Sequence, residues 1–278
     1  MIIIWGSKGA GKTSFLGALY FAIKKNNNWT IVPVNEHSNI FIQKIHDQMI
    51  DNKEFPLPTD PNDIDKVFTF EIGKNRTNAI TKMMYKFRKG SYKKIETSFI
   101  DAAGEFFEDP EKEKEFKNYI SNNINNVQGI LCLIDPDRAD SNSDDNKSYF
   151  SLLFDNLSKV RSILVSSSSK SSNLDKIPIP IAICLTKMDV KERKEYINSP
   201  ESFAKNIMGD IAYKLIQNYF DPDLIKYFAC SSVGFTEDGG PNIILNSEGI
   251  DRPFEVKPVN VIEPFEWLMK KISKQKIR

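Results

Sequence analysis

The first thirteen residues limit the fold more than any other part of the chain. An apolar run, Met1–Trp5, predicts a buried strand, and the sequence GSKGAGKT follows it directly as Gly6–Thr13. Apolar residues then recur at the spacing of one helix face over about residues 13–25. A strand, a loop of the form GxxxxGK[ST] and a helix, in this order, predict a phosphate-binding loop. The alternative is a glycine-rich turn with an incidental Lys-Thr pair.

The residue types of this loop suit an anion. Gly6 and Gly11 let the backbone turn tightly and bring its N–H groups against phosphate oxygens, and the positive end of the helix dipole faces the same anion. Lys12 is expected to reach the β- and γ-phosphates, and the Thr13 hydroxyl to ligate Mg²⁺. We expect the loop to bind a nucleotide through Gly6, Ser7, Lys8, Gly9, Ala10, Gly11, Lys12, Thr13 and Ser14.

Strand and helix patterns alternate along the rest of the chain. Strands are predicted at residues 29–34, 67–72, 83–88, 95–100, 127–134, 178–185 and 225–230, and helices at 36–51, 111–125, 147–165, 191–197, 202–220 and 260–273. Continuous apolar runs are typical of a parallel sheet buried on both faces. The chain is therefore predicted to be an α/β protein with a doubly wound, mostly parallel sheet that binds ligands at the carboxyl ends of its strands. Because no repeat or linker is visible, residues 1–278 are predicted to form one domain.

Charge and cysteine content argue against several classes of function. The chain has 38 Lys and Arg against 37 Asp and Glu, so its net charge of +1 gives no overall bias toward nucleic acid or membrane. With only His37 and His46, a histidine-rich metal site is excluded. Cys132, Cys184 and Cys230 lie in apolar runs without CxxC spacing, which favours buried reduced thiols in a cytoplasmic protein. No apolar run approaches the ~18 residues of a membrane span, and no leader precedes the first strand.

Four short sequences follow four of the predicted strands: GSKGAGKT, DAAG (Asp101–Gly104), TKMD (Thr186–Asp189) and SSVG (Ser231–Gly234). Their order and spacing resemble the G1, G3, G4 and G5 motifs of Ras-like (TRAFAC-class) P-loop GTPases. The resemblance covers nearly the whole chain and implies a GTP-binding G-domain. Compared with a minimal domain of this kind, the chain carries insertions at about residues 29–60 and 73–94 and a loop excursion at 234–258.

The resemblance implies roles for individual residues. Asp101 is expected to hold Mg²⁺ through a water, and the Gly104 N–H to bond the γ-phosphate. The Asp189 carboxylate would accept two hydrogen bonds from guanine that adenine cannot supply, and the stem of Lys187 would cover the base. Thr186 stands where the family usually has Asn, so its hydroxyl can tie this loop to the phosphate loop with fewer bonds. Guanine O6 would meet backbone N–H groups of Ser231, Ser232 and Val233.

Departures from the family pattern bear on hydrolysis. Glu105 stands where Ras-like enzymes carry a water-orienting Gln, and its carboxylate either accepts a proton from water or repels the γ-phosphate. Slow unassisted hydrolysis is therefore expected. Lys8 occupies a position where a bulky group would crowd an incoming arginine. Because no arginine lies between Lys12 and Thr59, an arginine finger is expected from elsewhere in the chain or in trans.

The Mg²⁺-binding switch threonine is predicted to be Thr59, because it lies in a loop just before the strand at residues 67–72. Thr77 is the alternative, and Thr59 as a simple turn residue is another. The residues predicted to carry the reaction are Lys12, Glu105, Thr59 and Gly104. The Phe-Pro-Leu-Pro-Thr loop that ends at Thr59, together with the sequence DAAGE, is similar to prokaryotic double-GTPase proteins.

Local charge suggests partners. Residues 73–94 contain eight bases and no acid, which indicates either a docking surface for an acidic partner, nucleic acid or an anionic headgroup, or a solvated hairpin. Residues 105–115 are acidic, so pairing of the two segments between copies is a route to nucleotide-dependent self-association.

Three functions fit these residues. The first is a GTP-hydrolysing switch that works with an unidentified effector or activating protein. The second is a GTP-binding interaction module without turnover, which Glu105 favours. The third is an ATPase or nucleoside kinase, which lacks support because no arginine-rich lid is visible.

Overall fold

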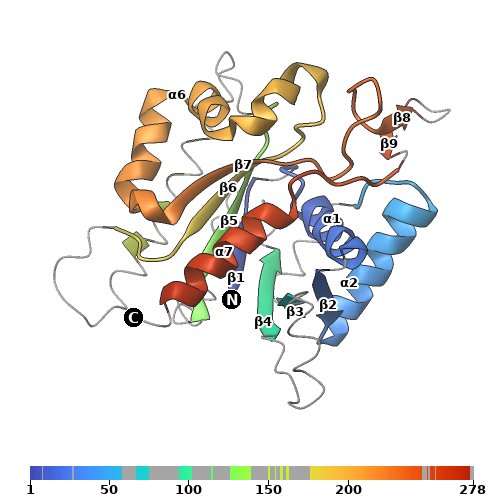
Figure 1. Ribbon diagram of the computed structural model, residues 1–278, viewed down its shortest axis with the longest axis horizontal. Coiled ribbons are helices and arrows are strands. Elements are labelled where there is room, and N and C mark those ends of the chain that lie inside the picture. The colour runs from blue at the N-terminus through green and yellow to red at the C-terminus, as the bar shows by residue number, and fades with distance from the viewer. Residues whose placement is uncertain are drawn as a thin grey trace, which may run out of the picture.

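The protein is described here by a computed structural model (Figure 1) that covers residues 1–7, 9–26, 28–57, 67–74, 94–101, 114, 126–138, 150, 154, 157–158, 161–162, 176–245, 249, 251–253 and 255–275. Within these residues, one large sheet runs through the centre. Its strands in chain order are β1 (Ile2–Trp5), β2 (Trp29–Pro33), β3 (Val67–Lys74), β4 (Lys94–Asp101), β5 (Gly129–Ile134), β6 (Ile181–Leu185) and β7 (Ile225–Ala229).

The spatial order of this sheet is β2-β3-β4-β1-β5-β6-β7. Strands β4, β1, β5, β6 and β7 pair in parallel, whereas β3 is antiparallel to both of its neighbours, β2 and β4. The first strand in the chain is thus the middle strand of the sheet, as in a doubly wound fold. The predicted fold class, a mostly parallel α/β sheet, is confirmed.

Two helical layers bury both faces of the sheet, and this explains the continuous apolar sequence of its central strands. In β1, Ile3 and Trp5 point into one core, while Ile2 and Ile4 point into the other. Alternate residues of β5 divide between the two cores in the same way. Such a strand has no side that tolerates a polar residue, so the pattern of β1 already fixes its central place.

The layer over Ile2 and Ile4 consists of α1 (Lys12–Lys25), α2 (Glu36–His46) and α7 (Ile262–Gln275), which lie on the same side of the sheet in Figure 1. Helix α7 buries a stripe at helical spacing, namely Phe265, Leu268, Met269 and Ile272. Helix α2 continues into one π-helical turn, η1 (Asp47–Asp51), so the predicted helix at 36–51 has two parts.

The opposite layer contains α6 (Pro200–Tyr219), preceded by the 3-10 helix η5 (Lys191–Asn198) and followed by the short η6 (Pro222–Leu224). Phe150, Phe154 and Leu157, spaced at i, i+4 and i+7, pack into the same core. Helix α6 is interrupted at Gly209, whose φ of 73° and ψ of 166° are not helical. The predicted helix at 202–220 is therefore two shorter helices that meet at a glycine.

Residues 29–57, most of the first insertion predicted between the phosphate loop and the DxxG strand, form a strand and a helix. Strand β2 extends the sheet beyond β3, and α2 packs beside it on the α1 face. The Asn35 side chain caps α2 by accepting a hydrogen bond from the Ser38 N–H, at 2.9 Å. The loop excursion predicted at 234–258 contains an antiparallel pair of short strands, β8 (Ile243–Leu245) and β9 (Asp251–Pro253), which the sequence did not indicate.

Several predicted elements lie outside the described residues. They are the strand at 83–88 and nearly all of the helices at 111–125 and 147–165. Where the chain is described, Cys132, Cys184 and Cys230 are free and buried, as predicted, although Cys230 follows the end of β7. In the described part of the chain, no helix combines the length and apolar character needed to cross a bilayer.

Candidate functional site

The loop between β1 and α1 has the shape of an anion cradle. Gly9 and Gly11 have positive φ angles of 79° and 80°, which residues with a side chain rarely adopt. Gly6 was predicted to let the backbone turn, but the structure gives another reason for glycine there. A Cβ at Gly6 would lie 2.7 Å from the carbonyl oxygen of Leu133, so glycine is needed for close packing against β5. The turning freedom of the loop therefore comes from Gly9 and Gly11.

Positive charge converges on this cradle. The Lys12 ammonium, which is buried, donates hydrogen bonds to the carbonyl oxygens of Gly6 and Ser7 at 2.9 and 3.0 Å. Helix α1 begins with no side-chain cap and no acidic residue in its first turn, which includes Thr13 and Ser14. Its N-terminal N–H groups and the Lys12 charge thus favour an anion at the same place.

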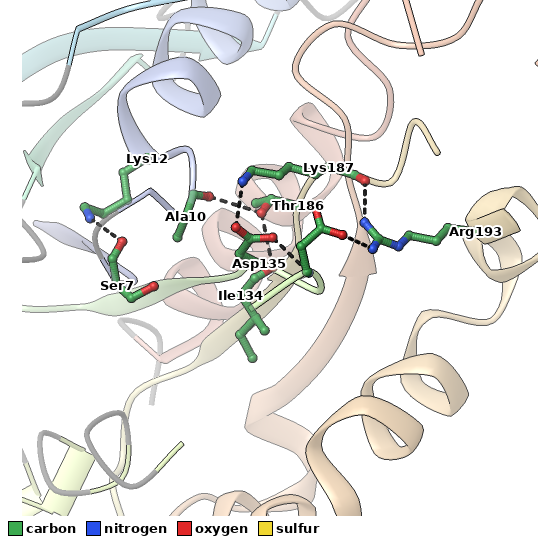
Figure 2. A network of polar contacts seen from close by, with 9 residues as sticks. Ser7, Ala10, Lys12, Ile134, Asp135, Thr186, Lys187 and Arg193 are labelled. Carbon is green, nitrogen blue, oxygen red and sulfur yellow. Dashed lines mark hydrogen bonds and ion pairs between the residues drawn. The ribbon is translucent and has the colours of Figure 1, made fainter. Parts of the chain in front are cut away.

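The loop after β6 is joined to the phosphate loop by Thr186. This buried hydroxyl lies 3.1 Å from the carbonyl oxygen of Ala10 and 3.1 Å from that of Ile134 (Figure 2). Because a hydroxyl has one hydrogen, it shares that hydrogen between the two acceptors. This contact joins the loop after β6 to the phosphate loop, as was predicted for the Thr186 hydroxyl.

Asp189 lies on the same loop and is buried, with 6% of its surface exposed. Within the described residues its carboxylate forms no hydrogen bond and no ion pair. Its carboxylate oxygens keep contact with solvent, so donors of a ligand can reach them. The neighbouring Met188 N–H donates to the Cys230 carbonyl oxygen at 3.2 Å, which ties this loop to the segment after β7.

The segment Ser231–Val233 is placed beside this loop but differs in detail from the expectation. The Ser231 N–H donates to the carbonyl oxygen of Val259 at 3.0 Å, and the Ser231 hydroxyl accepts from the N–H groups of Val233 and Gly234 at 3.3 and 2.7 Å. Ser231 therefore stabilises the turn itself. Of the three predicted N–H groups, only that of Ser232 makes no hydrogen bond within the described structure.

A fourth loop, after β5, borders the site and was not singled out by the sequence analysis. Asp135 is buried and pairs with Lys187, whose Nζ is 2.6 Å from its Oδ2. Arg193 pairs with Asp137 and also donates from Nη1 to the Lys187 carbonyl oxygen at 3.1 Å (Figure 2). A signal existed in the sequence: Asp135 follows a buried strand directly, as Gly6 and Thr186 do, but it opens a stretch rich in Asp and Ser that suggested a solvated loop.

Arg138, in the same loop, lies beside the phosphate loop. Its Nη1 lies 3.8 Å from the point where a Cβ on Gly9 would stand. The loop after β5 therefore brings a guanidinium to the phosphate loop. The sequence had excluded an arginine only between Lys12 and Thr59 and did not point to Arg138.

Other predicted site residues lie outside the described residues: Lys8, Thr59, Gly104 and Glu105, the alternative Thr77, and most of the basic and acidic segments at 73–94 and 105–115. For Asp101 the backbone alone is described. It ends β4 and pairs in register with Ile4 of β1, two residues before Gly6. The backbone thus brings Asp101 to the edge of the sheet that carries the phosphate loop.

No protein-family model and no curated protein matches the chain. Among solved structures, the chain is similar to the signal recognition particle receptor SRb in its GTP-bound complex with SRX from Chaetomium thermophilum, with 16% identity, coverage of 85% of this chain and 92% of that one, and a TM-score of 0.48. It is also similar to the small GTPase Arl6 from Trypanosoma brucei with a bound GppNp, with 12% identity, coverage of 99% and 97%, and a TM-score of 0.41. A third is an ADP-ribosylation-factor-like or Sar1 GTPase from Encephalitozoon cuniculi in complex with GDP, with 14% identity, coverage of 99% and 80%, and a TM-score of 0.38. These TM-scores are all below 0.5, so no residue's role is drawn from them.

Proposed function

We propose that this protein binds GTP with Mg²⁺, hydrolyses it to GDP and phosphate, and acts as a nucleotide-dependent switch. The observation that carries the proposal is Asp189, a largely buried residue whose carboxylate has no partner among the described residues and which lies on a loop that Thr186 joins to the phosphate loop. Guanine presents N1–H and N2–H side by side, which two carboxylate oxygens can accept together. Adenine has no such pair of donors, so Asp189 would select the base.

The phosphate loop supports a bound polyphosphate. Before an anion enters, the Lys12 ammonium is held by two carbonyl oxygens of its own loop, so it is already oriented at the cradle. Phosphate oxygens would replace these weaker acceptors with charge-assisted bonds. The guanidinium of Arg138 beside Gly9 adds a second positive charge near the same phosphates.

The residues available for a magnesium ion fit that ion. Thr13 lies in the first turn of α1, and the backbone register brings Asp101 beside the end of β1. A hydroxyl and a carboxylate are oxygen ligands of the kind that Mg²⁺ prefers, and Thr59 is proposed as the third. The ion would neutralise charge on the β- and γ-phosphates. Gly104 and Glu105 are proposed to meet the γ-phosphate and the attacking water.

The narrower proposals concern regulation. The loop that ends at Thr59 and the sequence DAAGE support a protein of the prokaryotic double-GTPase type. Such a switch would act through an effector or activating protein, or through self-association that pairs residues 73–94 with 105–115. Three free, buried thiols are compatible with the reducing cytoplasm in which we propose that it works.

The test is calorimetric titration of the purified protein with GTP, GDP and ATP in the presence of Mg²⁺. Wild-type protein should bind both guanine nucleotides and not ATP. Lys12→Ala should lose binding of the phosphates, whereas Asp189→Ala should lower the affinity for GTP and GDP to the level of that for ATP. Equal binding of ATP and GTP by the wild type would reject the assignment of Asp189.

A single-turnover assay then separates a hydrolase from a module that only binds GTP. Release of phosphate from bound GTP, even at a slow rate, supports hydrolysis. Tight GTP binding with no phosphate released over many hours would leave the interaction module as the function.

A further inference from the structure

The inference concerns Asp135, the residue that directly follows β5. Only 1% of its side chain is exposed. Its Oδ1 accepts a hydrogen bond from the Asp137 N–H at 3.0 Å, and its Oδ2 lies 2.6 Å from Nζ of Lys187. A buried carboxylate that meets an ammonium at this distance forms a charge-assisted bond, which is shielded from competing water on one side. Asp135 thus fixes the direction of the Lys187 side chain.

The backbone of Lys187 also needs support. Its φ of 52° lies in the left-handed region, which costs free energy for a residue with a side chain. The Lys187 carbonyl oxygen accepts a hydrogen bond from Arg193, and Arg193 in turn pairs with Asp137. The two ion pairs therefore hold both ends of Lys187, its ammonium and its backbone, against the loop after β5 (Figure 2).

Thr186 explains why this support matters. An amide side chain at that position could donate two hydrogen bonds, whereas the Thr186 hydroxyl divides one hydrogen between the carbonyl oxygens of Ala10 and Ile134. Residue 186 alone thus holds the loop less firmly than an amide could. The ion pairs with the loop after β5 make up the difference.

We propose that Asp135 is a positioning residue that holds the stem of Lys187 over the nucleotide base and so sets how long the nucleotide stays bound. This rests on the proposed function, because it assumes that a base lies between this loop and the phosphate loop. Asp135 acts on the Lys187 ammonium directly, and on the Lys187 backbone through Asp137 and Arg193.

The test is the rate at which a fluorescent GDP analogue dissociates from Asp135→Asn, Lys187→Met and the double variant. Loss of one hydrogen bond to a charged group changes an equilibrium by about tenfold or more, so each single variant should release the analogue at least about tenfold faster than wild type. The double variant should be accelerated by clearly less than the product of the two single effects, because both substitutions remove the same ion pair. Asp210→Asn is the matched control: it removes the exposed ion pair with Lys205, at 3.6 Å and away from the site, and should leave the rate unchanged.

Wild-type dissociation rates in Asp135→Asn would overturn the proposal, and so would a double variant in which the two single effects multiply in full. Should Asp135→Asn fail to fold, Lys187→Met still decides, because 45% of the Lys187 side chain is exposed and its replacement leaves the core intact. An unchanged rate in Lys187→Met would then reject the proposal.

The two proposals fail in different ways. If the wild type binds no guanine nucleotide, the proposed function is rejected, and the effect of Asp135 on nucleotide release with it. The positioning of Lys187 by Asp135 is not rejected by that result. Amide hydrogen exchange of residues 186–189 in nucleotide-free protein still tests Asp135, because Asp135→Asn must raise exchange there. Equal exchange in the variant and the wild type would overturn the positioning role.

Discussion

Replacing Asp189 with asparagine should change ligand binding and protein stability in opposite directions. The wild-type residue is 6% exposed, and its carboxylate oxygens keep some contact with solvent but have no donor within the described residues. An unpaired buried polar group costs about 1–3 kcal/mol, and Asp189→Asn removes the charge while keeping the shape. For a chain of this size each kcal/mol corresponds to roughly 2–4 °C, so nucleotide-free Asp189→Asn should melt about 2–12 °C higher than wild type.

Binding should move the other way. Two hydrogen bonds from guanine to a carboxylate contribute about 1.5–3 kcal/mol each, or about 3–6 kcal/mol together. The Asn side chain keeps one acceptor oxygen, but its NH₂ group would face an N–H donor of guanine. GTP affinity should therefore fall by at least about 100-fold. Melting curves of protein stripped of nucleotide with EDTA, followed by titration with GTP, measure both effects. A lower melting temperature of the stripped variant would refute the reasoning, because it would mean that the carboxylate is satisfied within the protein.

Three further changes test other parts of the structure. Thr186→Val keeps the volume but removes the hydroxyl shared by two carbonyl groups, one of them on Ala10, so the melting temperature should fall by about 2–4 °C for a loss of about 1 kcal/mol. Gly6→Ala should abolish nucleotide binding and destabilise the fold, since its Cβ would stand 2.7 Å from the backbone oxygen of Leu133; calorimetry with GTP that matches wild type would contradict this. Burial raises the pKa of the Cys132 thiol to about 12, so the folded state keeps a proton that the unfolded state releases, and the free energy of unfolding should decline as the pH rises from about 9 toward 12, as measured by urea titration at several pH values.

The parts of the fold that were predictable are those in which burial leaves one solution. Strand β1, with apolar side chains on both faces, can only be a central strand, and helix α7 shows its buried stripe at helical spacing. The hairpin β8–β9 was missed because each strand has three residues, too few for an alternating pattern. The break in α6 was missed because one glycine within an apolar periodic pattern does not predict a positive φ by itself.

The site shows the same division. Thr186 and Asp189 were found because a short motif followed a core strand. Asp135 was missed, because its burial depends on the Lys187 ammonium, 52 residues away in sequence and reached only through the pairing of β5 with β6. The need for glycine at position 6 was predicted, but from the turn of the loop. The reason that the structure gives, close contact with β5, is not visible in the sequence of the loop itself.

The central place of β1 has a consequence for the order in which the protein is made. Ile2 is made well before Phe99 and Gly129, its partners in the sheet. The hydrogen bond that closes the site, from Thr186 to Ala10, spans 176 residues. At ~5–20 residues per second, roughly 9–35 s separate the synthesis of these two residues. During that time the phosphate loop has no finished site around it, so a nucleotide can stabilise only a chain that already extends beyond Thr186.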